Sequence, residues 1–230
     1  MFIGMVRVKN ETKYIERSVR SLLNVCEEVH VLDDHSTDDT AIKALNAGCS
    51  VYPSPFPEDS LNESRDKTWL LDRVVESLPP GNLSQVWVVS IDGDEEICYR
   101  DLERLRSETR QREVSYSFRI LTLYDSPTQI RVDGVYANMT RPSMFRLIRP
   151  NMTFKSNGRY GGGFHCTNVP ADIGFLKKLH EPPIRVLHYG YMEKENRERK
   201  YEFYLKHDPG HANWYQRECL SAPTLAPLVI

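Results

Sequence analysis

Strand-like apolar runs alternate with segments of helical spacing along roughly the first 110 residues. The runs lie at 2–9, 29–34, 49–55 and 86–91. Between them, apolar residues recur every three or four positions, which is the spacing of one face of a helix. This alternation predicts an α/β fold in which a mostly parallel central sheet carries helices on both faces.

Signals for helix starts and stops accompany this pattern. Asn10 or Thr12 can cap the first helix, and Gly48 can end the second. The third helix is expected from about Glu63 to the PPG sequence at 79–81.

The pattern becomes irregular in the second half of the chain. A helix is expected at 99–110, and loops rich in Gly, Pro and Asn then separate strand-like runs at 114–124, 144–149 and 184–191. A polar helix carrying Tyr201 follows the last run.

The length of 230 residues suits one domain with a sizeable core. No linker of domain-separating length interrupts the chain. We therefore expect a single domain over 1–230, with a nucleotide-binding half at about 1–110 and an irregular half at about 111–230.

Charge and cysteine content narrow the class of protein. A net charge of -2 gives no electrostatic signature of general nucleic-acid binding, although Arg and Lys recur between Arg141 and Arg159. The five cysteines include no C-x-x-C pair, which argues against a disulfide framework and a zinc site. No apolar segment approaches the roughly 18 residues of a membrane span, and no signal peptide is recognisable. We expect a cytoplasmic protein.

Polar clusters follow three of the predicted strands, at residues 9–11, 33–36 and 92–94. Ligands of open α/β sheets bind outside the carboxyl ends of the strands, so these clusters are expected at one edge. Asp92 and Asp94 are two residues apart and point the same way in an extended backbone, while Gly93 lets the chain turn. Two converging carboxylates predict a site for Mn²⁺ or Mg²⁺. The alternative is a solvated acidic loop.

These motifs resemble a known family. VRVKNETKYIERSVRSLL, then VHVLDDHSTDDT, then a strand ending in DGDE are similar to a family 2 glycosyltransferase with the GT-A fold. That family has N-E after its first strand and D-D-x-S-x-D-x-T after its second. The resemblance covers roughly residues 2–110. In the second half, FRLIRP, GFHC and LHYGY are similar to the tail of the bacterial lipopolysaccharide-type branch.

The resemblance implies a GT-A, Rossmann-like fold with an acceptor-side second half. It implies a metal-dependent glycosyltransferase that moves a sugar from a nucleotide-diphosphate sugar, with a UDP-sugar favoured, to an acceptor with inversion. The acceptor class stays open among a glycan, a lipid-linked sugar, a small molecule and a nucleic acid.

The resemblance also implies roles for residues at the donor. The Val8 backbone and Glu11 would hold the nucleoside, and Asp33 or Asp34 would hydrogen-bond the base. Arg65 stands where the family has an Arg-Asn pair that faces the diphosphate, but here an Asp follows it.

Three further residues are implied at the metal. Asp94 would bind the cation, and Asp92 would face the ribose or a metal-bound water. His188 ends a strand-like run and is expected to bind the metal or a phosphate.

The general base is not assigned by the sequence. His165 follows three glycines, and the related branch tends to have a Glu directly after this His, where this chain has Cys166. The remaining acidic candidates for the base are Asp125, Asp133, Asp172 and Glu181.

Two alternatives stay open. One is a catalytically inactive nucleotide-sugar-binding protein of the same fold, which Cys166 favours and the intact Asp92/Asp94 pair disfavours. The other is a D-x-D phosphatase, whose motif belongs on the first strand of the chain rather than the fourth.

Overall fold

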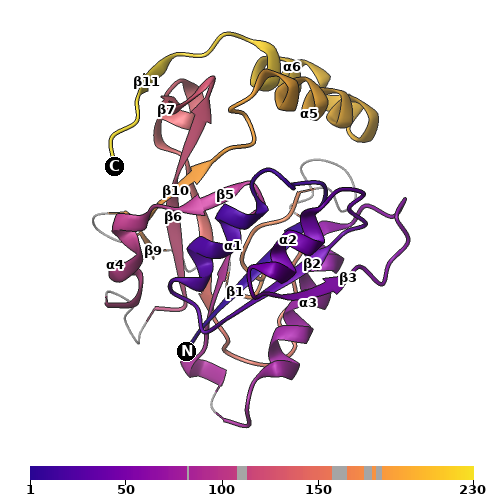
Figure 1. Cartoon of the computed structure of the whole chain (residues 1–230), viewed down its shortest axis with the longest axis vertical. Helices are drawn as coiled ribbons and strands as arrows, with labels where there is room; N and C mark the ends of the chain where they lie inside the picture. The colour runs from indigo at the N-terminus through magenta and orange to yellow at the C-terminus, as the bar shows by residue number, and fades with distance from the viewer. Residues whose placement is uncertain (82, 108–112, 157–164, 174–177, 180–182) are drawn as a thin grey trace.

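The computed structural model describes residues 1–81, 83–107, 113–156, 165–173, 178–179 and 183–230 (Figure 1). Its first half alternates strands and helices as the sequence predicts. The elements are β1 (Phe2–Val8), α1 (Ile15–Leu23), β2 (Glu28–Asp33), α2 (Thr40–Asn46), β3 (Ser50–Pro53), α3 (Glu63–Ser77) and β4 (Trp87–Ser90).

The chain after β4 is richer in strands than the sequence predicts. Its longer elements are β5 (Glu95–Ile97), α4 (Leu102–Ser107), β6 (Ser115–Tyr124), β7 (Ser126–Arg131), β8 (Thr140–Arg146), β9 (Lys178–Leu179), β10 (Arg185–His188), α5 (Lys194–His207), α6 (Ala212–Leu220) and β11 (Leu225–Pro227). Short 3-10 helices occur at Leu83–Gln85, Tyr99–Asp101, Gly134–Asn138 and Pro209–His211. The predicted strands at 114–124 and 184–191 correspond to β6 and β10, and the polar helix is α5, whereas the run predicted at 144–149 overlaps only the end of β8. The helix predicted at 99–110 is a 3-10 turn followed by α4, and residues 108–110 lie outside the described residues. The elements β5, β7, β9, β11 and α6 are additions.

The described strands form one sheet in the order β11-β7-β6-β8-β4-β1-β2-β3. Strands β3, β2, β1 and β4 are parallel to one another, and β8 continues the sheet antiparallel to β4. Strand β10 joins from the side, parallel to β6 and antiparallel to β5. The α/β class is confirmed, with β1 to β4 forming the continuous parallel part of the sheet.

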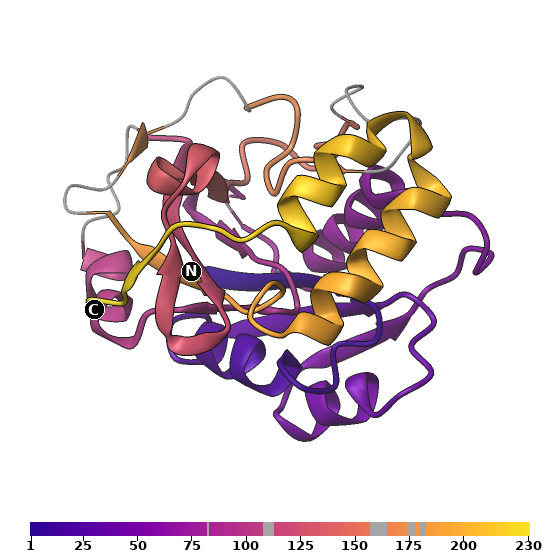
Figure 2. The same ribbon diagram turned by 90° about the horizontal axis from the view of Figure 1, so that it is seen from above.

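Helices cover both faces of the parallel strands, as Figure 2 shows for α1 and α2 on one side and α3 on the other. The side chains of β1 alternate between two hydrophobic cores, because successive residues of a strand point to opposite faces. Ile3 and Met5 belong to the core that contains Leu70 of α3. Val6 and Val8 belong to the core that contains α1 and α2. Among the described helices, none is long and apolar enough to cross a bilayer.

The predicted cap of the first helix is wrong. The helix begins after Tyr14, which makes no capping bond through its side chain. Asn10 instead has a φ of 55°, and its side chain accepts a hydrogen bond from the Thr37 N–H at 2.8 Å. Asn10 therefore joins two loops at the sheet edge. Gly48, with a φ of 101°, follows the end of α2 as predicted.

Short strand β5 brings the second half of the chain onto the carboxyl edge of β4. It pairs with β10 so that His188 lies opposite Glu95. The Tyr189 N–H donates to the Asp94 carbonyl at 2.9 Å. Helices α5 and α6 then lie above the carboxyl ends of the parallel strands (Figure 1). The candidate site is thus enclosed from both halves.

Gly93 is required for a close approach rather than for a turn, because its φ is not in the left-handed region. A Cβ placed there would lie 2.5 Å from Val8 Cγ2.

We expect Gly93→Ala to lower the free energy of unfolding by about 1–3 kcal/mol, the usual cost of overpacking. Urea denaturation should show this loss. Gly210→Ala is the matched control, since no atom lies within 4 Å of its added Cβ. Equal stability of the two variants would contradict the close packing.

Candidate functional site

The carboxyl ends of β1 and β2 lie side by side. Val8 pairs with Asp33 in the parallel register, and the Asp34 N–H donates to the Val8 carbonyl at 2.8 Å. The Val8 carbonyl is therefore already engaged within the sheet. The structure brings Val8, Asp33 and Asp34 together as the sequence predicts.

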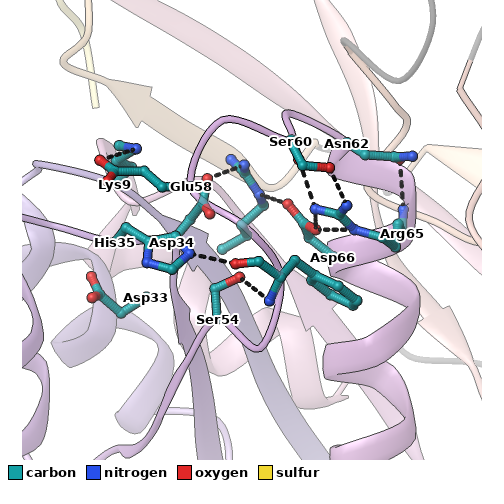
Figure 3. Close-up of polar contacts among 12 residues, drawn as sticks. Lys9, Asp33, Asp34, His35, Ser54, Glu58, Ser60, Asn62, Arg65 and Asp66 are labelled. Atoms are coloured by element: carbon teal, nitrogen blue, oxygen red, sulfur yellow. Dashed lines mark hydrogen bonds and ion pairs between the residues drawn. The ribbon is translucent and has the colours of Figure 1, made fainter.

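Asp34 belongs to an internal ion-pair network (Figure 3). Arg7 of β1 contacts Asp34 at 2.5 Å and Asp66 of α3 at 2.9 Å. Asp66 also accepts hydrogen bonds from Arg65 at 2.8 and 3.0 Å. The acidic residue that replaces the expected Asn after Arg65 thus ties α3 to β1 and β2.

Arg65 is held by its own segment in this structure. Nη1 donates to the Ser60 hydroxyl at 2.6 Å, and Nη2, which also contacts Asp66, donates to the Ser60 carbonyl at 2.7 Å, as Figure 3 shows. Its guanidinium also stacks on the Phe56 ring at 3.8 Å. Arg65 would have to leave these partners to contact a diphosphate.

Asp33 differs from Asp34 because one of its two carboxylate oxygens has no hydrogen-bond partner in the described part of the chain. Oδ2 accepts the Ser36 N–H at 3.3 Å, while the buried Oδ1 finds no hydrogen-bond partner among the described residues. A buried acceptor without a partner is costly unless a ligand supplies a donor. Of the two candidates for the base contact, the geometry therefore favours Asp33.

The acids after β4 are neutralised by side chains from other elements. Arg141 of β8 contacts Asp92 at 2.8 Å and also pairs with Glu95. Glu95 in turn accepts the Asp92 N–H at 3.0 Å. Burial disfavours the charge of Asp92, but Arg141 and Lys67 together keep the pKa of that carboxyl below its usual value. Asp92 is therefore ionised and fixed.

Asp94 has separate partners. His188 Nε2 lies 3.4 Å from Asp94 Oδ2, and Lys200 Nζ of α5 lies 3.0 Å from the same oxygen. Burial alone would raise the pKa of Asp94, but Lys200 and His188 hold it well below its usual range. The structure thus brings Asp94 and His188 together as the sequence predicts, and adds Lys200. The two carboxylates of the D-x-D are bound by different cations.

Glu11 lies in the β1–α1 loop, close enough to Asp94 for their charges to interact. Burial and then the Asp94 charge raise the pKa of Glu11 to about 8. A pocket of about 180 Å³ opens beside Glu11 between the β1–α1 loop and α5, with Arg199 in its lining. Glu11 therefore links the nucleoside edge of the site to the Asp94 cluster.

Asp94 and His188 fit one side of a divalent-cation site. Their oxygen and nitrogen donors converge, and a Cβ on Gly190 would lie 2.3 Å from Asp94 Oδ2 and 2.7 Å from His188 Nε2. The backbone thus leaves room at these two donors. Among the described residues, no group of three His, Cys, Asp or Glu side chains is arranged to hold a metal. Mg²⁺-type ions commonly take one or two carboxylates and complete their shell with substrate phosphates and water.

The candidate bases are engaged elsewhere. Asp125 pairs with Arg197 at 2.7 Å. Asp133 and Asp172 are held by Arg131 and Arg149 at 2.9 and 2.7 Å, and Glu181 lies outside the described residues.

His165 is near enough to Asp92 and Glu63 for their charges to act on it. It has a φ of 63°, and its ring lies 5.8 Å from the Tyr204 ring of α5. Burial lowers the pKa of His165, which favours the neutral imidazole. The N–H of the following Cys166 donates to Glu63 of α3 at 3.2 Å. A neutral imidazole can accept a proton, but none of these contacts identifies the base.

Sequence reasoning missed Lys200 and the specific role of Arg141. Lys200 lies in a helix with several other basic residues, so nothing in the sequence distinguishes it. Arg141 begins the basic stretch noted in the sequence, but its pairing with Asp92 depends on β8 lying against β4.

Comparison with known proteins supports the fold class and the type of chemistry. No protein-family model matches the chain. A protein of Rickettsia bellii named an uncharacterized glycosyltransferase is 26% identical over 205 residues, which is 87% of this chain. The alignment spans 64% of that relative, so this chain is shorter than the proteins it matches. The chain is a homologue of proteins named glycosyltransferases.

Solved structures show the same fold. TarS of Staphylococcus aureus superposes with a TM-score of 0.55 and 15% identity, covering 95% of this chain and 42% of TarS. This likeness agrees with the predicted GT-A fold. Glucosyl-3-phosphoglycerate synthase of Mycobacterium tuberculosis, in complex with Mn²⁺, uridine diphosphate and phosphoglyceric acid, covers 55% of this chain and 44% of that protein at 22% identity. Its TM-score of 0.36 is too low to support an argument.

The pairing of Asp94 with Lys200 should be measurable as a coupling energy. Asp94→Asn and Lys200→Met each leave a mostly buried charge without its partner, so each should lower the free energy of unfolding by about 1–3 kcal/mol. The double variant should lose less than the sum by about 0.5–3 kcal/mol. Urea denaturation with a chelator present gives all four values. Strictly additive losses would contradict the ion pair.

Glu11 should make stability depend on pH. Its pKa in the folded protein is about 8, against an ordinary value of 4.5, so between these values the folded state keeps a proton that the unfolded state releases. Stability should therefore fall as pH rises through this window. We expect Glu11→Gln to remove this fall, and thermal denaturation from pH 5 to 9 with a chelator measures it. Parallel curves for both proteins would show that Glu11 is not protonated in the fold.

Proposed function

We propose that this chain transfers a sugar from a nucleotide-diphosphate sugar to an acceptor. Support comes from homologues named glycosyltransferases, and the GT-A fold is compatible with this activity. The acidic carboxyl ends of β1, β2 and β4 lie together where α/β sheets bind ligands.

The unpaired Oδ1 of Asp33 is the observation that carries the proposal. It is a buried acceptor at the end of β2, beside Val8 and opposite the loop that Arg65 anchors. A uracil ring presents an N–H that can donate to such an oxygen, which is compatible with the uridine donor that the family resemblance implies. Val8 and Glu11 would border the nucleoside in this arrangement.

The diphosphate would lie over the Asp92–Asp94 edge. We propose that Asp94 and His188 bind a divalent cation, with Mn²⁺ or Mg²⁺ as candidates. Such an ion, when bound, would stabilise the negative charge of the leaving diphosphate. Asp92, fixed by Arg141, would face the ribose or a water of the cation. Arg65 would reach the diphosphate only after leaving its present partners.

We also propose that the sugar is transferred to the acceptor with inversion. This transfer requires a general base that removes a proton from the acceptor. His165 is a described candidate near enough to Asp92 for their charges to interact. The arginine partners of Asp125, Asp133 and Asp172 favour a second candidate function, a nucleotide-sugar-binding protein without transferase activity. Metal-dependent hydrolysis of a UDP-sugar distinguishes the two functions, because only the active protein breaks the sugar–phosphate bond.

The organisation of the chain completes the proposal. We propose that residues 1–230 act as one glycosyltransferase domain, with a donor half at about 1–110 and an acceptor half at about 111–230. The five cysteines are free thiols, which suits the cytoplasmic location expected from the sequence.

Nucleotide binding tests the proposal directly. We expect uridine diphosphate with Mn²⁺ to raise the melting temperature more than the adenosine or guanosine diphosphates do, because ligands of the folded state stabilise it. Asp33→Asn should weaken binding of uridine diphosphate about tenfold, a loss of about 1.4 kcal/mol. Calorimetric titration measures both effects.

Asp39→Asn is the matched control for this experiment, since Asp39 follows the same strand and is exposed. It should bind uridine diphosphate like the wild type. If no nucleoside diphosphate binds in the presence of Mn²⁺, the proposed function is wrong. If Asp33→Asn binds as tightly as Asp39→Asn, the base contact is misplaced.

A further inference from the structure

Lys200 of α5 is directed toward the candidate site rather than toward solvent. It projects from α5 to the end of β4, where its ammonium lies 3.0 Å from Asp94 Oδ2. The ammonium also lies 5.2 Å from the centre of the Tyr191 ring. Its side chain keeps 20% of its exposure, so the charged end is largely removed from solvent. Such a lysine needs a compensating anion.

The backbone is shaped around this contact. A Cβ on Gly190 would lie 2.3 Å from Lys200 Nζ and 2.3 Å from Asp94 Oδ2. A residue with a side chain at this position would push the ammonium and the carboxylate apart. The ion pair is therefore part of the folded site rather than a flexible surface contact.

The Asp94 carboxylate can pair with only a limited amount of positive charge. Lys200 and His188 already converge on its Oδ2 atom. A divalent cation at the same carboxylate would lie within a few ångströms of the ammonium, where like charges repel strongly in a buried site. The cation and the ammonium therefore compete for Asp94.

A diphosphate would remove this competition. It carries enough negative charge to accept both a divalent cation and an ammonium. Arg141 is bound to Asp92 and Glu95 and is therefore engaged. Lys200 pairs with one carboxylate and has a long flexible stem, so a short movement can transfer it to a phosphate oxygen.

We propose that Lys200 is an exchangeable counter-ion: it neutralises Asp94 in the donor-free site and pairs with the donor diphosphate when a divalent cation takes Asp94. The inference rests on the proposed function. It makes metal and nucleotide binding mutually dependent, because each ligand removes the obstacle to the other. Lys200 is in this sense a positioning residue for the donor.

The proposal predicts effects of opposite sign from one substitution. Lys200→Met should bind Mn²⁺ alone at least about fivefold more tightly than the wild type, because the competitor of the cation is gone. It should bind uridine diphosphate at saturating Mn²⁺ at least about fivefold more weakly, because the phosphate contact that Lys200 makes once the cation holds Asp94 is lost. A purely structural lysine would change both affinities in the same direction or neither.

Calorimetry or Mn²⁺ electron paramagnetic resonance on the whole chain measures these affinities. Lys206→Met is the matched control, since Lys206 lies on the same helix and is exposed. Lys200→Gln removes the charge but can still donate a hydrogen bond to Asp94, so it carries the test if Lys200→Met does not fold. Circular dichroism shows whether each variant is folded.

The outcomes separate this inference from the proposed function. If the wild type binds uridine diphosphate and both affinities of the folded Lys200 variant stay within about twofold of the Lys206 control, the exchange is wrong and the proposed function stands. If the variant binds Mn²⁺ alone more weakly, the exchange is also wrong. If the wild type binds no nucleoside diphosphate, the proposed function fails and this inference fails with it.

Discussion

The four acids between Asp92 and Glu96 can be crowded at the end of β4 only because side chains from distant parts of the chain compensate them. Asp94 and Glu95 are buried, and Asp92 and Glu96 are partly exposed. Two like charges 4 Å apart repel by about 4 kcal/mol at an effective dielectric of 20, so the run would be unstable without partners. Arg141 neutralises two of these acids, and Lys200 with His188 neutralises Asp94. Glu96 accepts a hydrogen bond from the Tyr189 hydroxyl at 2.6 Å. The end of β4 therefore determines where β8, β10 and α5 must lie.

This requirement joins the two halves of the chain. The parallel strands supply the acids, and the irregular half supplies nearly all of the compensating groups. Strand β5 makes the connection, because its pairing with β10 sets the Tyr189 N–H on the Asp94 carbonyl. Gly93 and Gly190 allow the backbone to approach the cluster closely from either side. The contacts that neutralise these acids are therefore also the contacts that close the site.

The sequence predicts the parts of this arrangement that depend on local pattern. The strand and helix periods identify β1 to β4 and α1 to α3, and the polar strand ends locate the site edge. Strands as short as β5 have no readable period, so the element that positions His188 cannot be found in this way. The role of Lys200 is equally hidden, because it arises when α5 folds over β4. Asn10 shows the same limit, since its side chain satisfies a neighbouring loop rather than the helix it precedes.

The two edges of the proposed donor site differ in how far they are satisfied before a ligand arrives. At the end of β2, Asp33 keeps an unpaired buried oxygen, so a base can gain a hydrogen bond there without displacing any protein group. At the end of β4, Asp92, Asp94 and Glu95 are each paired with a basic side chain, although the buried Oε1 of Glu95 has no hydrogen-bond partner among the described residues. A diphosphate that reaches Asp94 must therefore exchange one ion pair for another. The nucleoside edge should therefore contribute net affinity and selectivity for the base. The diphosphate edge should contribute less net affinity, because the Lys200–Asp94 contact must be lost as new contacts form. Donor binding at this edge can instead change which charged groups surround the sugar–phosphate bond that breaks.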